Sequence, residues 1–307
     1  MVNNDELELF ARCASGFEKI LADELKGLGM RRVRPLKGGV AFFGQLKDAY
    51  RACLWSRVAT RVQLVITRVP AKTADTLYDA VAAFAWEDHI PSGATVAVDA
   101  HGQNEALRNT KFTALKVKDA VCDRLRRVRG ARPNVDAHDP DFSLNVALHA
   151  QKATLYLNLS GPSLHRRGYR EDGVQTEAPL KETLAAGLLL AADWPATARQ
   201  GGVLVDPMCG SGTLAVEGAL MATNRAPGLL RERWGFEGWA LHDAERWGRV
   251  LTSAYEAIDD TADALVLAGD IDASAVNIAR QNVRRAGVES VVRLFVDDAA
   301  RLGRHLR

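Results

Sequence analysis

The feature that most constrains the fold of this 307-residue chain is the stretch VLVDPMCGSGT, residues 203–213. Its first three residues are apolar, which is typical of a short strand buried on both faces of a parallel sheet. Gly210 and Gly212 lack Cβ atoms and therefore let a ligand approach the backbone. Thr213 then begins a helix whose free N–H groups point towards that ligand. The pattern predicts a strand, a turn and a helix that together bind a nucleotide-like molecule.

The glycine spacing of this turn argues against two common nucleotide-binding motifs. No Lys follows the last glycine, so the turn is not a Walker A loop. The three-glycine dinucleotide spacing is also missing, which makes a nicotinamide dehydrogenase the least favoured function for this chain.

Two later strands also end in acidic residues. The apolar run 264–269 leads to Asp270, where a carboxylate suits the hydroxyls of a ribose. Asp272 fits better as the N-cap of the next helix. The run 291–295 leads to Asp298 and Ala299, at the position for an adenine edge, although a helix cap is an equal alternative for Asp298 alone. Three such turns in order favour a ligand site along one sheet edge.

The order of elements predicts an α/β protein of three units. Residues 1–70 follow the βαββαβ order of a ferredoxin-like domain, with a hairpin turn at Lys37–Gly38. Residues 71–160 form a second α/β unit with a long helix at 111–129 and a closing hairpin, and residues 161–179 are interpreted as a linker. Residues 180–307 hold the glycine turn, three strands and an aromatic-rich insertion at 224–262, whose tryptophans are expected to pack rather than stack on bases.

The charge is balanced over the chain but not locally. Lys+Arg number 40 against 38 Asp+Glu, which implies no polyelectrolyte partner for the whole protein. Between Arg108 and Arg132, however, nine basic residues face only Asp119 and Asp123. Clustered cations bind phosphates by releasing counterions, so we expect RNA there; a solvated helix face is the alternative. The candidate RNA-binding residues are Arg108, Lys111, Lys118, Arg124 and Arg127, with Arg166 and Arg167 in the linker.

That long helix does not need a ligand to be stable. Phe112, Leu115, Val121, Leu125 and Val128 are expected to form its buried stripe.

Several protein classes are disfavoured by what the sequence lacks. The four cysteines stand singly, which argues against a zinc site or a disulfide framework. We therefore expect no metal. The N-terminus shows no signal peptide, and the longest small-apolar run, 184–192, is too short for a membrane span, so a cytoplasmic protein is expected.

Residues 206–213, DPMCGSGT, resemble the first motif of class I S-adenosylmethionine-dependent methyltransferases. The Asp-Pro opening is typical of members that act on exocyclic amines of nucleobases. Residues 164–170, 178–185, 222–229 and 234–236 are similar to one subgroup, the THUMP-containing 23S rRNA guanine-N2 methyltransferases. Residues 108–112 and 118–120 resemble its THUMP domain. The resemblance covers nearly the whole chain and implies a ferredoxin-like unit, a THUMP domain and a Rossmann-like methyltransferase domain.

The resemblance also implies roles for individual residues. Asp206, Cys209, Gly210 and Gly212 would bind the methionine end of S-adenosylmethionine, and Pro207 and Thr213 would also contact the cofactor. Asp270 would bind its ribose, Ile271 would lie against its adenine, and Asp298 and Ala299 would bind the adenine edge. Pro179 would close the pocket from the linker side.

The same family places its chemistry in an Asn/Asp-Pro-Pro-Tyr/Phe motif after the fourth strand. These 307 residues contain no such motif, and only three of the seven strands of the family's sheet can be placed. No catalytic residue is therefore assigned. We expect an incomplete methyltransferase domain that binds RNA and cofactor but does not transfer methyl groups alone.

Three other functions remain open. A tRNA guanine-N2 methyltransferase shares the THUMP domain and the first motif. A non-catalytic RNA-binding protein with a degenerate cofactor fold is a different class, against which the intact glycines argue. An adenine-N6 DNA methyltransferase is less favoured because it would not need the two N-terminal units.

Overall fold

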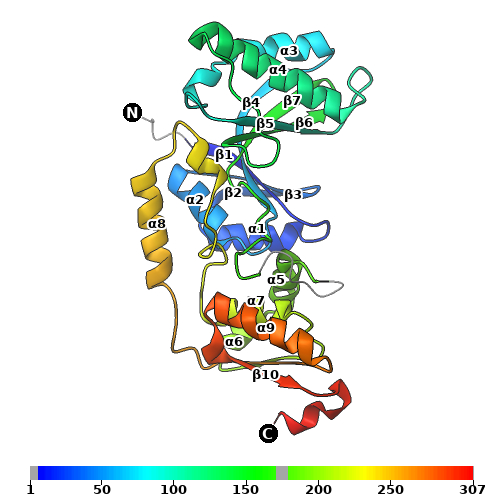
Figure 1. Ribbon diagram of the computed structural model, residues 1–307, viewed down its shortest axis with the longest axis vertical. Coiled ribbons are helices and arrows are strands. Elements are labelled where there is room, and N and C mark those ends of the chain that lie inside the picture. Colours follow the sequence, from blue (N-terminus) through cyan, green and yellow to red (C-terminus); the bar gives the residue numbers. More distant parts are fainter. Residues whose placement is uncertain (1–5, 171–178, 307) are drawn as a thin grey trace.

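The computed structural model describes residues 6–170 and 179–306. Its three units are stacked along the long axis of the molecule (Figure 1). The first unit contains β1 (Leu7–Arg12), α1 (Glu18–Gly27), β2 (Arg31–Leu36), β3 (Gly39–Gly44), α2 (Leu46–Trp55) and β4 (Arg61–Pro70). The predicted ferredoxin-like order and the hairpin between β2 and β3 are thus confirmed.

The second unit follows directly and contains the long basic helix. Its elements are α3 (Ala74–Ala83), η1 (Trp86–Asp88), β5 (Val96–His101), α4 (Thr110–Arg129), β6 (Phe142–His149) and β7 (Lys152–Asn158). The strands β6 and β7 pair antiparallel as the predicted hairpin, and β5 lies parallel to β6.

The first two units share one sheet, which the sequence did not reveal. Strand β4 pairs with β7, giving a seven-stranded sheet of order β2-β3-β1-β4-β7-β6-β5. The register aligns Leu9, Leu64, Leu157 and Leu144 across four strands, so they lie on one face. All four belong to a single apolar core that also contains the buried residues of α1 to α4. The two units therefore fold against each other as one body.

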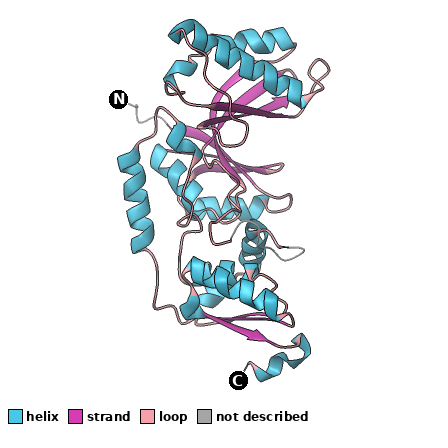
Figure 2. Cartoon of the chain, viewed as in Figure 1, coloured by secondary structure: helices cyan, strands magenta, loops and turns pink. Residues whose placement is uncertain are grey.

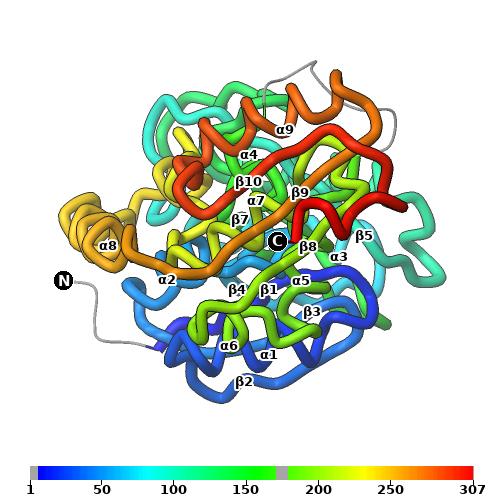
Figure 3. The backbone as a smooth tube through the Cα atoms, turned by 90° about the horizontal axis from the view of Figure 1, so that it is seen from below, coloured from blue at the N-terminus to red at the C-terminus, as the bar shows by residue number. Residues whose placement is uncertain are grey.

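The third unit contains α5 (Glu182–Ala191), α6 (Trp194–Ala198), β8 (Val203–Asp206), α7 (Thr213–Ala222), β9 (Leu265–Asp270), α9 (Ala273–Ala286), η3 (Glu289–Val291), β10 (Val292–Val296) and η4 (Ala299–Arg304). Its parallel sheet has the order β10-β9-β8, so β8 is an edge strand. Figure 1 shows α7 and α9 between β10 and the first two units, and in Figure 3, seen from below, the red chain of β10 and η4 lies in front. Helix α7 contacts all three strands and also α5, α6 and α9. Val203 is 50% exposed, which corrects the expectation that 203–205 is buried on both faces.

Residues 224–262, the aromatic-rich insertion, form a strap that returns to the N-terminal units. The strap contains η2 (Gly235–Gly238) and α8 (Ala244–Glu256), and α8 lies beside α2 (Figures 1 and 2). Phe236 N–H donates to the carbonyl of Leu159 at 3.0 Å. Trp234 and Phe236 are buried in the core of the first two units, as are Trp239 and Trp247. The prediction that these aromatic side chains pack is confirmed.

Among the described residues, no helix is long and apolar enough to cross a membrane. The same residues contain no cluster of side chains that could hold a metal ion.

Candidate cofactor site and nucleic-acid interface

The carboxyl ends of β8, β9 and β10 meet at one edge of the small sheet. Asp206 ends β8 and Asp270 ends β9, and Val296 pairs with Asp270 in the parallel register. Asp270 accepts hydrogen bonds from Gly210 N–H at 2.8 Å and from Asp272 N–H at 3.1 Å. Each of its oxygens keeps a second acceptor site, which can bind ligand hydroxyls. The structure thus brings the glycine turn and two of the three acidic residues together.

The two glycines of the turn have different physical roles. Both have positive φ, +52° for Gly210 and +78° for Gly212. A Cβ on Gly210 would point into open space, so this position suits ligand approach. A Cβ on Gly212 would meet the Cβ of Ala279 at 2.9 Å. The lack of a Cβ at Gly212 therefore lets α7 pack closely on α9, and its contact with the cofactor stays a prediction.

The surroundings of the turn suit a ligand with polar and apolar parts. Met208 is 77% exposed and Ile271 is 73% exposed, so two large apolar side chains flank the carboxylates. Burial raises the pKa of Asp206, and the nearby charge of Asp270 raises it further. Burial also raises the pKa of Cys209 to about 12, so this thiol stays protonated near neutral pH. The site therefore offers acceptors, a neutral thiol and apolar faces rather than a nucleophile.

The remaining predicted cofactor residues occupy less central positions. Asp298 accepts from Ala300 N–H at 2.9 Å and caps η4, the alternative that the sequence left open. Asp272 caps α9 by accepting from Ser274 N–H at 2.8 Å, as expected. Pro179 lines a separate pocket beside α5. The adjoining linker residues 171–178 lie outside the described part of the chain.

Arg170 holds the turn from the linker side, a role that the sequence did not indicate. It forms an ion pair with Glu182 at 2.9 Å and donates to the carbonyl of Leu180 at 2.8 Å. It also donates to the hydroxyl of Thr213, the first residue of α7. Because these contacts join α5, the linker and α7, Arg170 fixes the position of the helix that follows the glycine turn.

The basic helix α4 is less electropositive than its sequence indicates. Arg124 forms an ion pair with Glu87, and Arg132 pairs with Asp119 at 2.9 Å. The expectation that these cations lack matching acids is therefore wrong for Arg124 and Lys116, because Glu87 and Asp75 come from segments that fold onto the helix, Asp75 pairing with Lys116 at 3.5 Å. Arg127 donates to the carbonyl of Ala82 at 3.2 Å.

The amino-terminal half of α4 is more accessible. Lys111 is exposed, and no partner for its side chain is found in the described residues. Arg108 is exposed as well, and the one side-chain hydrogen bond found for it in the described residues goes to the nearby carbonyl of Glu105. Lys118 is mostly buried and pairs with Asp119 at 2.8 Å. Phe112 and Leu115 are 43% and 53% exposed, which corrects the predicted apolar stripe.

The buried face of α4 is formed by other residues than expected. They are Thr113, Val117, Ala120, Val121, Cys122 and Leu125, so only Val121 and Leu125 of the predicted stripe are buried. Val128, the fifth predicted member, is exposed.

The two linker arginines that were predicted to bind RNA, Arg166 and Arg167, have opposite surroundings. Arg167 is 2% exposed and pairs with Glu217, which is fully buried, at 3.2 Å. This burial corrects the expectation that Arg167 contacts RNA, because its guanidinium faces the protein interior. Arg166 is exposed and remains a candidate.

Three segments of the chain match models of known protein families. Residues 167–306 match a family model described as RMKL-like methyltransferase domain, residues 8–63 match the RlmL ferredoxin-like domain, and residues 71–158 match the THUMP domain. The fold and the glycine turn thus define a class I S-adenosylmethionine-dependent methyltransferase domain that follows a ferredoxin-like unit and a THUMP unit. The chain belongs to the THUMP-containing family of RMKL-like methyltransferases.

Two of its relatives carry the name Ribosomal RNA large subunit methyltransferase K/L. The protein from Syntrophotalea carbinolica is 46% identical over 289 residues, covering 94% of this chain and 40% of the relative. The protein from Pseudomonas aeruginosa is 45% identical over 299 residues, covering 96% and 41%. The chain therefore spans about 40% of the length of the curated relatives it matches.

Solved structures show the same arrangement of units. SMU.472, assigned to the methyltransferases and crystallised with SAH, superposes with a TM-score of 0.83 at 31% identity, covering 96% of this chain and 76% of that one. A Listeria monocytogenes protein, named for N6-adenine-specific DNA methylases, superposes with a TM-score of 0.84 at 32% identity, covering 96% and 75%.

Proposed function

We propose that this chain binds S-adenosylmethionine at the carboxyl ends of β8 and β9 and belongs to an enzyme that methylates the exocyclic N2 amine of a guanine in 23S rRNA. The observation that carries the cofactor proposal is the contact of Asp270 with Gly210 N–H at 2.8 Å, which supports Asp270 as the ribose acceptor because its carboxylate lies beside the turn. The named relatives support rRNA of the large subunit as the substrate.

The residues of the turn fit the chemistry of this cofactor, which supplies an activated methyl group when bound. The carboxylate of Asp270 would accept from ribose hydroxyls, and the exposed side chain of Ile271 would lie against the adenine. Asp206 would accept from the amino group at the methionine end. Positioning of donor and acceptor supplies much of the rate in such transfers.

The Asp206-Pro207 opening of the turn supports an exocyclic amine of a nucleobase as the methyl acceptor. The preference for guanine rests on the resemblance of residues 164–170, 178–185, 222–229 and 234–236 to the guanine-N2 subgroup. The exocyclic amine is a weak nucleophile because its lone pair is delocalised into the ring, so it needs acceptors for its protons and a stacking ring for the extruded base. In the family, an Asn/Asp-Pro-Pro-Tyr/Phe motif supplies these groups, and the 307 residues contain no consecutive prolines. We therefore propose cofactor and RNA binding for these 307 residues and no methyl transfer by them alone.

RNA binding is proposed for the accessible end of α4 and for the linker. Arg108, just before α4, and Lys111, in its first turn, are the cations we retain, together with Arg166. Lys118 is a secondary candidate, because it is mostly buried and pairs with Asp119. Arg124 and Arg127 are secondary candidates, since their guanidinium groups already have protein partners.

Calorimetry with S-adenosylmethionine tests the cofactor proposal. The D270A variant is expected to lose at least tenfold in affinity, because a charged acceptor of two ribose hydroxyls contributes about 1.5–3 kcal/mol. The matched control is D263A, since Asp263 is exposed and lies at the other end of β9. Equal affinity of D270A and the unmodified chain would overturn the assigned site.

A further inference from the structure

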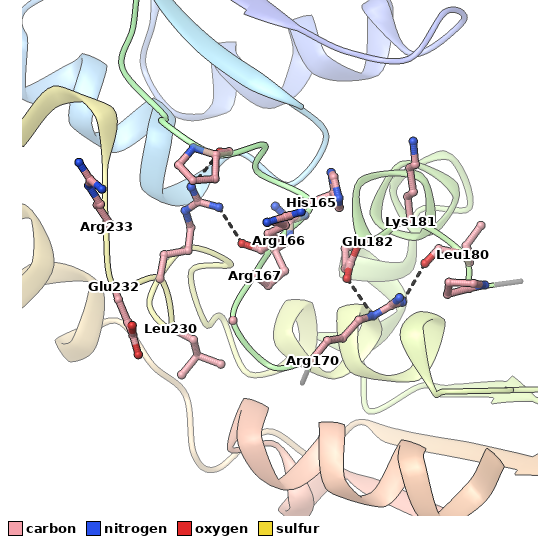
Figure 4. A pocket seen from close by; sticks show the side chains of 14 residues that line it. His165, Arg166, Arg167, Arg170, Leu180, Lys181, Glu182, Leu230, Glu232 and Arg233 are labelled. Carbon is pink, nitrogen blue, oxygen red and sulfur yellow. Dashed lines mark hydrogen bonds and ion pairs between the residues drawn. The ribbon is translucent and has the colours of Figure 1, made fainter. Parts of the chain in front are cut away.

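A pocket of about 480 Å³ lies between the linker, the amino end of α5 and the strap. Figure 4 shows side chains from these three segments around it, with Arg166 and His165 from the linker and Lys181 from the start of α5. Six Lys or Arg residues line this linker pocket, against two acidic residues, Glu182 and Glu232.

Most of these cations are already used to build the pocket. Arg231 of the strap donates to the carbonyls of Ser160, Pro162, Ser163 and Arg166 at 2.7–3.1 Å. These four bonds fold the linker around the guanidinium and fix its path.

Two further arginines and a glycine complete this framework. Arg167 is bound to Glu217, and Arg233 pairs with Asp139 and with Asp141. A Cβ on Gly168 would meet the carbonyl oxygen of Leu230 at 2.3 Å, so glycine allows the linker to approach the strap.

Arg166 and Lys181 are the exceptions. Both are exposed, and no hydrogen-bond or ion-pair partner of either side chain is found within residues 6–170 and 179–306. Of the acids beside them, Glu182 is bound to Arg170, and Glu232 is exposed to solvent. Within the described part of the chain, the pocket therefore presents two cations without a protein partner, which is an arrangement suited to an anion.

The position of the linker pocket indicates which kind of anion it binds. A second cavity shares Pro162, His165, Arg166 and Arg233 with it and extends to Ala97 of β5 and other strand residues of the THUMP unit. On the opposite side, Arg170 lines the linker pocket and binds Thr213 at the start of α7. The linker pocket thus lies between the THUMP sheet and the cofactor turn, which under the proposed function are the two ends of the path of a bound RNA.

We propose that the linker pocket binds a backbone phosphate of the substrate RNA between Arg166 and Lys181 and so directs the strand towards the glycine turn. This inference rests on the proposed function and adds a defined phosphate subsite to it. Exposed cations that neutralise phosphates make the affinity depend on salt, and each phosphate contact of a single strand contributes about 0.7 to the slope of log K against log salt.

The test is the binding of a single-stranded RNA oligonucleotide, followed by fluorescence anisotropy over a series of salt concentrations. The R166A/K181A variant is expected to bind more weakly and to show a slope smaller by about 1.4, two contacts at roughly 0.7 each. The charge-retaining variant R166K/K181R should keep the slope. A matched control is K19A/R199A, which removes an exposed Lys and an exposed Arg outside the pocket lining.

The outcomes separate this inference from the proposed function. An unchanged slope for R166A/K181A, with RNA still bound, would overturn the phosphate subsite and leave the proposed function standing. A chain that binds S-adenosylmethionine but no RNA at any salt would overturn both RNA proposals. Millimolar inorganic phosphate is expected not to displace the oligonucleotide from the unmodified chain. This result, together with the slope change in R166A/K181A, supports a phosphodiester as the ligand. Displacement by phosphate with no slope change would identify a free-phosphate site instead.

Discussion

Arg167 and Glu217 form an ion pair that is almost completely removed from water, at 3.2 Å with side-chain exposures of 2% and 0%. Arg167 also donates to the carbonyl of Arg57 at 2.6 Å, and Tyr169 donates to Glu217 at 3.3 Å. Arg57 lies just after α2, whereas Glu217 lies in the middle of α7. The pair therefore joins the ferredoxin-like unit to the helix that carries the cofactor turn.

Replacement of Glu217 by Gln is expected to destabilise the chain by about 3–5 kcal/mol, because it leaves a buried guanidinium without its counter-charge. Urea unfolding measures the change. The double variant R167M/E217L should be less destabilised than the sum of the two single variants, since it removes both charges. Simple additivity in this cycle would contradict the assigned pairing.

Alanine is expected to lower the free energy of unfolding by different amounts at Gly212 and at Gly210. G212A should cost about 2–4 kcal/mol, since it adds a steric clash with Ala279 to the strain of a positive φ. G210A meets no neighbouring atom, so only the backbone strain remains, roughly 1–2 kcal/mol. Unfolding curves of the two variants decide this order. Equal losses would mean that α7 and α9 do not pack as described.

Trp234 is 3% exposed and packs on Phe236 and Trp247 with ring centroids 5.6 and 5.5 Å away. W234A is expected to cost about 3–5 kcal/mol and to release the strap from the N-terminal units. Limited proteolysis should then cleave within residues 224–262 faster than in the unmodified chain. The control is Y255A on the same strap, because Tyr255 is 57% exposed. Similar cleavage rates in both variants would rule out this role of Trp234.

Burial, with added repulsion from Lys181, Arg166, Arg167 and Arg170, lowers the pKa of His165 to about 4. An NMR titration of its ring protons should show a neutral imidazole at pH 6. In R166A/K181A the pKa should rise but stay below 6.5, because burial is the largest cause. A pKa near 6.5 in the unmodified chain would contradict these surroundings.

The same shift makes the stability of the chain depend on pH. The unfolded state binds a proton at His165 near pH 6.5 and the folded state only near pH 4. The unfolded state therefore binds more protons between these values, and the contribution of His165 to stability is lost as the pH falls from about 6.5 to about 4. Urea unfolding at a series of pH values should show a smaller loss over this range for H165N.

Variants at Lys111 and Arg124 are expected to separate the contribution of α4 to RNA binding from its contribution to the stability of the chain. K111A is expected to weaken RNA binding and to leave stability within about 0.5 kcal/mol, because Lys111 is exposed and unpaired within the described chain. R124A should keep most of the RNA affinity but lose stability, since Arg124 is 20% exposed and bound to Glu87. Anisotropy and thermal unfolding of both variants check this, and the reverse assignment would move the RNA surface to the carboxyl end of α4.

The sequence alone determined the features that depend on local chemistry. The strand, turn and helix around Gly210 follow from apolar spacing and glycine placement, which act over a few residues. The cap at Asp272 and the hairpin at Lys37–Gly38 depend equally on near neighbours. The resemblance of residues 206–213 to a methyltransferase motif is confirmed by the family to which the chain belongs.

The tertiary structure decided which side chains remain available for function. Arg166 and Arg167 are adjacent in sequence, yet one is exposed and the other is buried against Glu217, 50 positions further along. Likewise, Glu87 neutralises Arg124 from a separate segment. Pairing and burial of this kind depend on contacts between residues far apart in the chain, and periodicity and local charge contain no information about them.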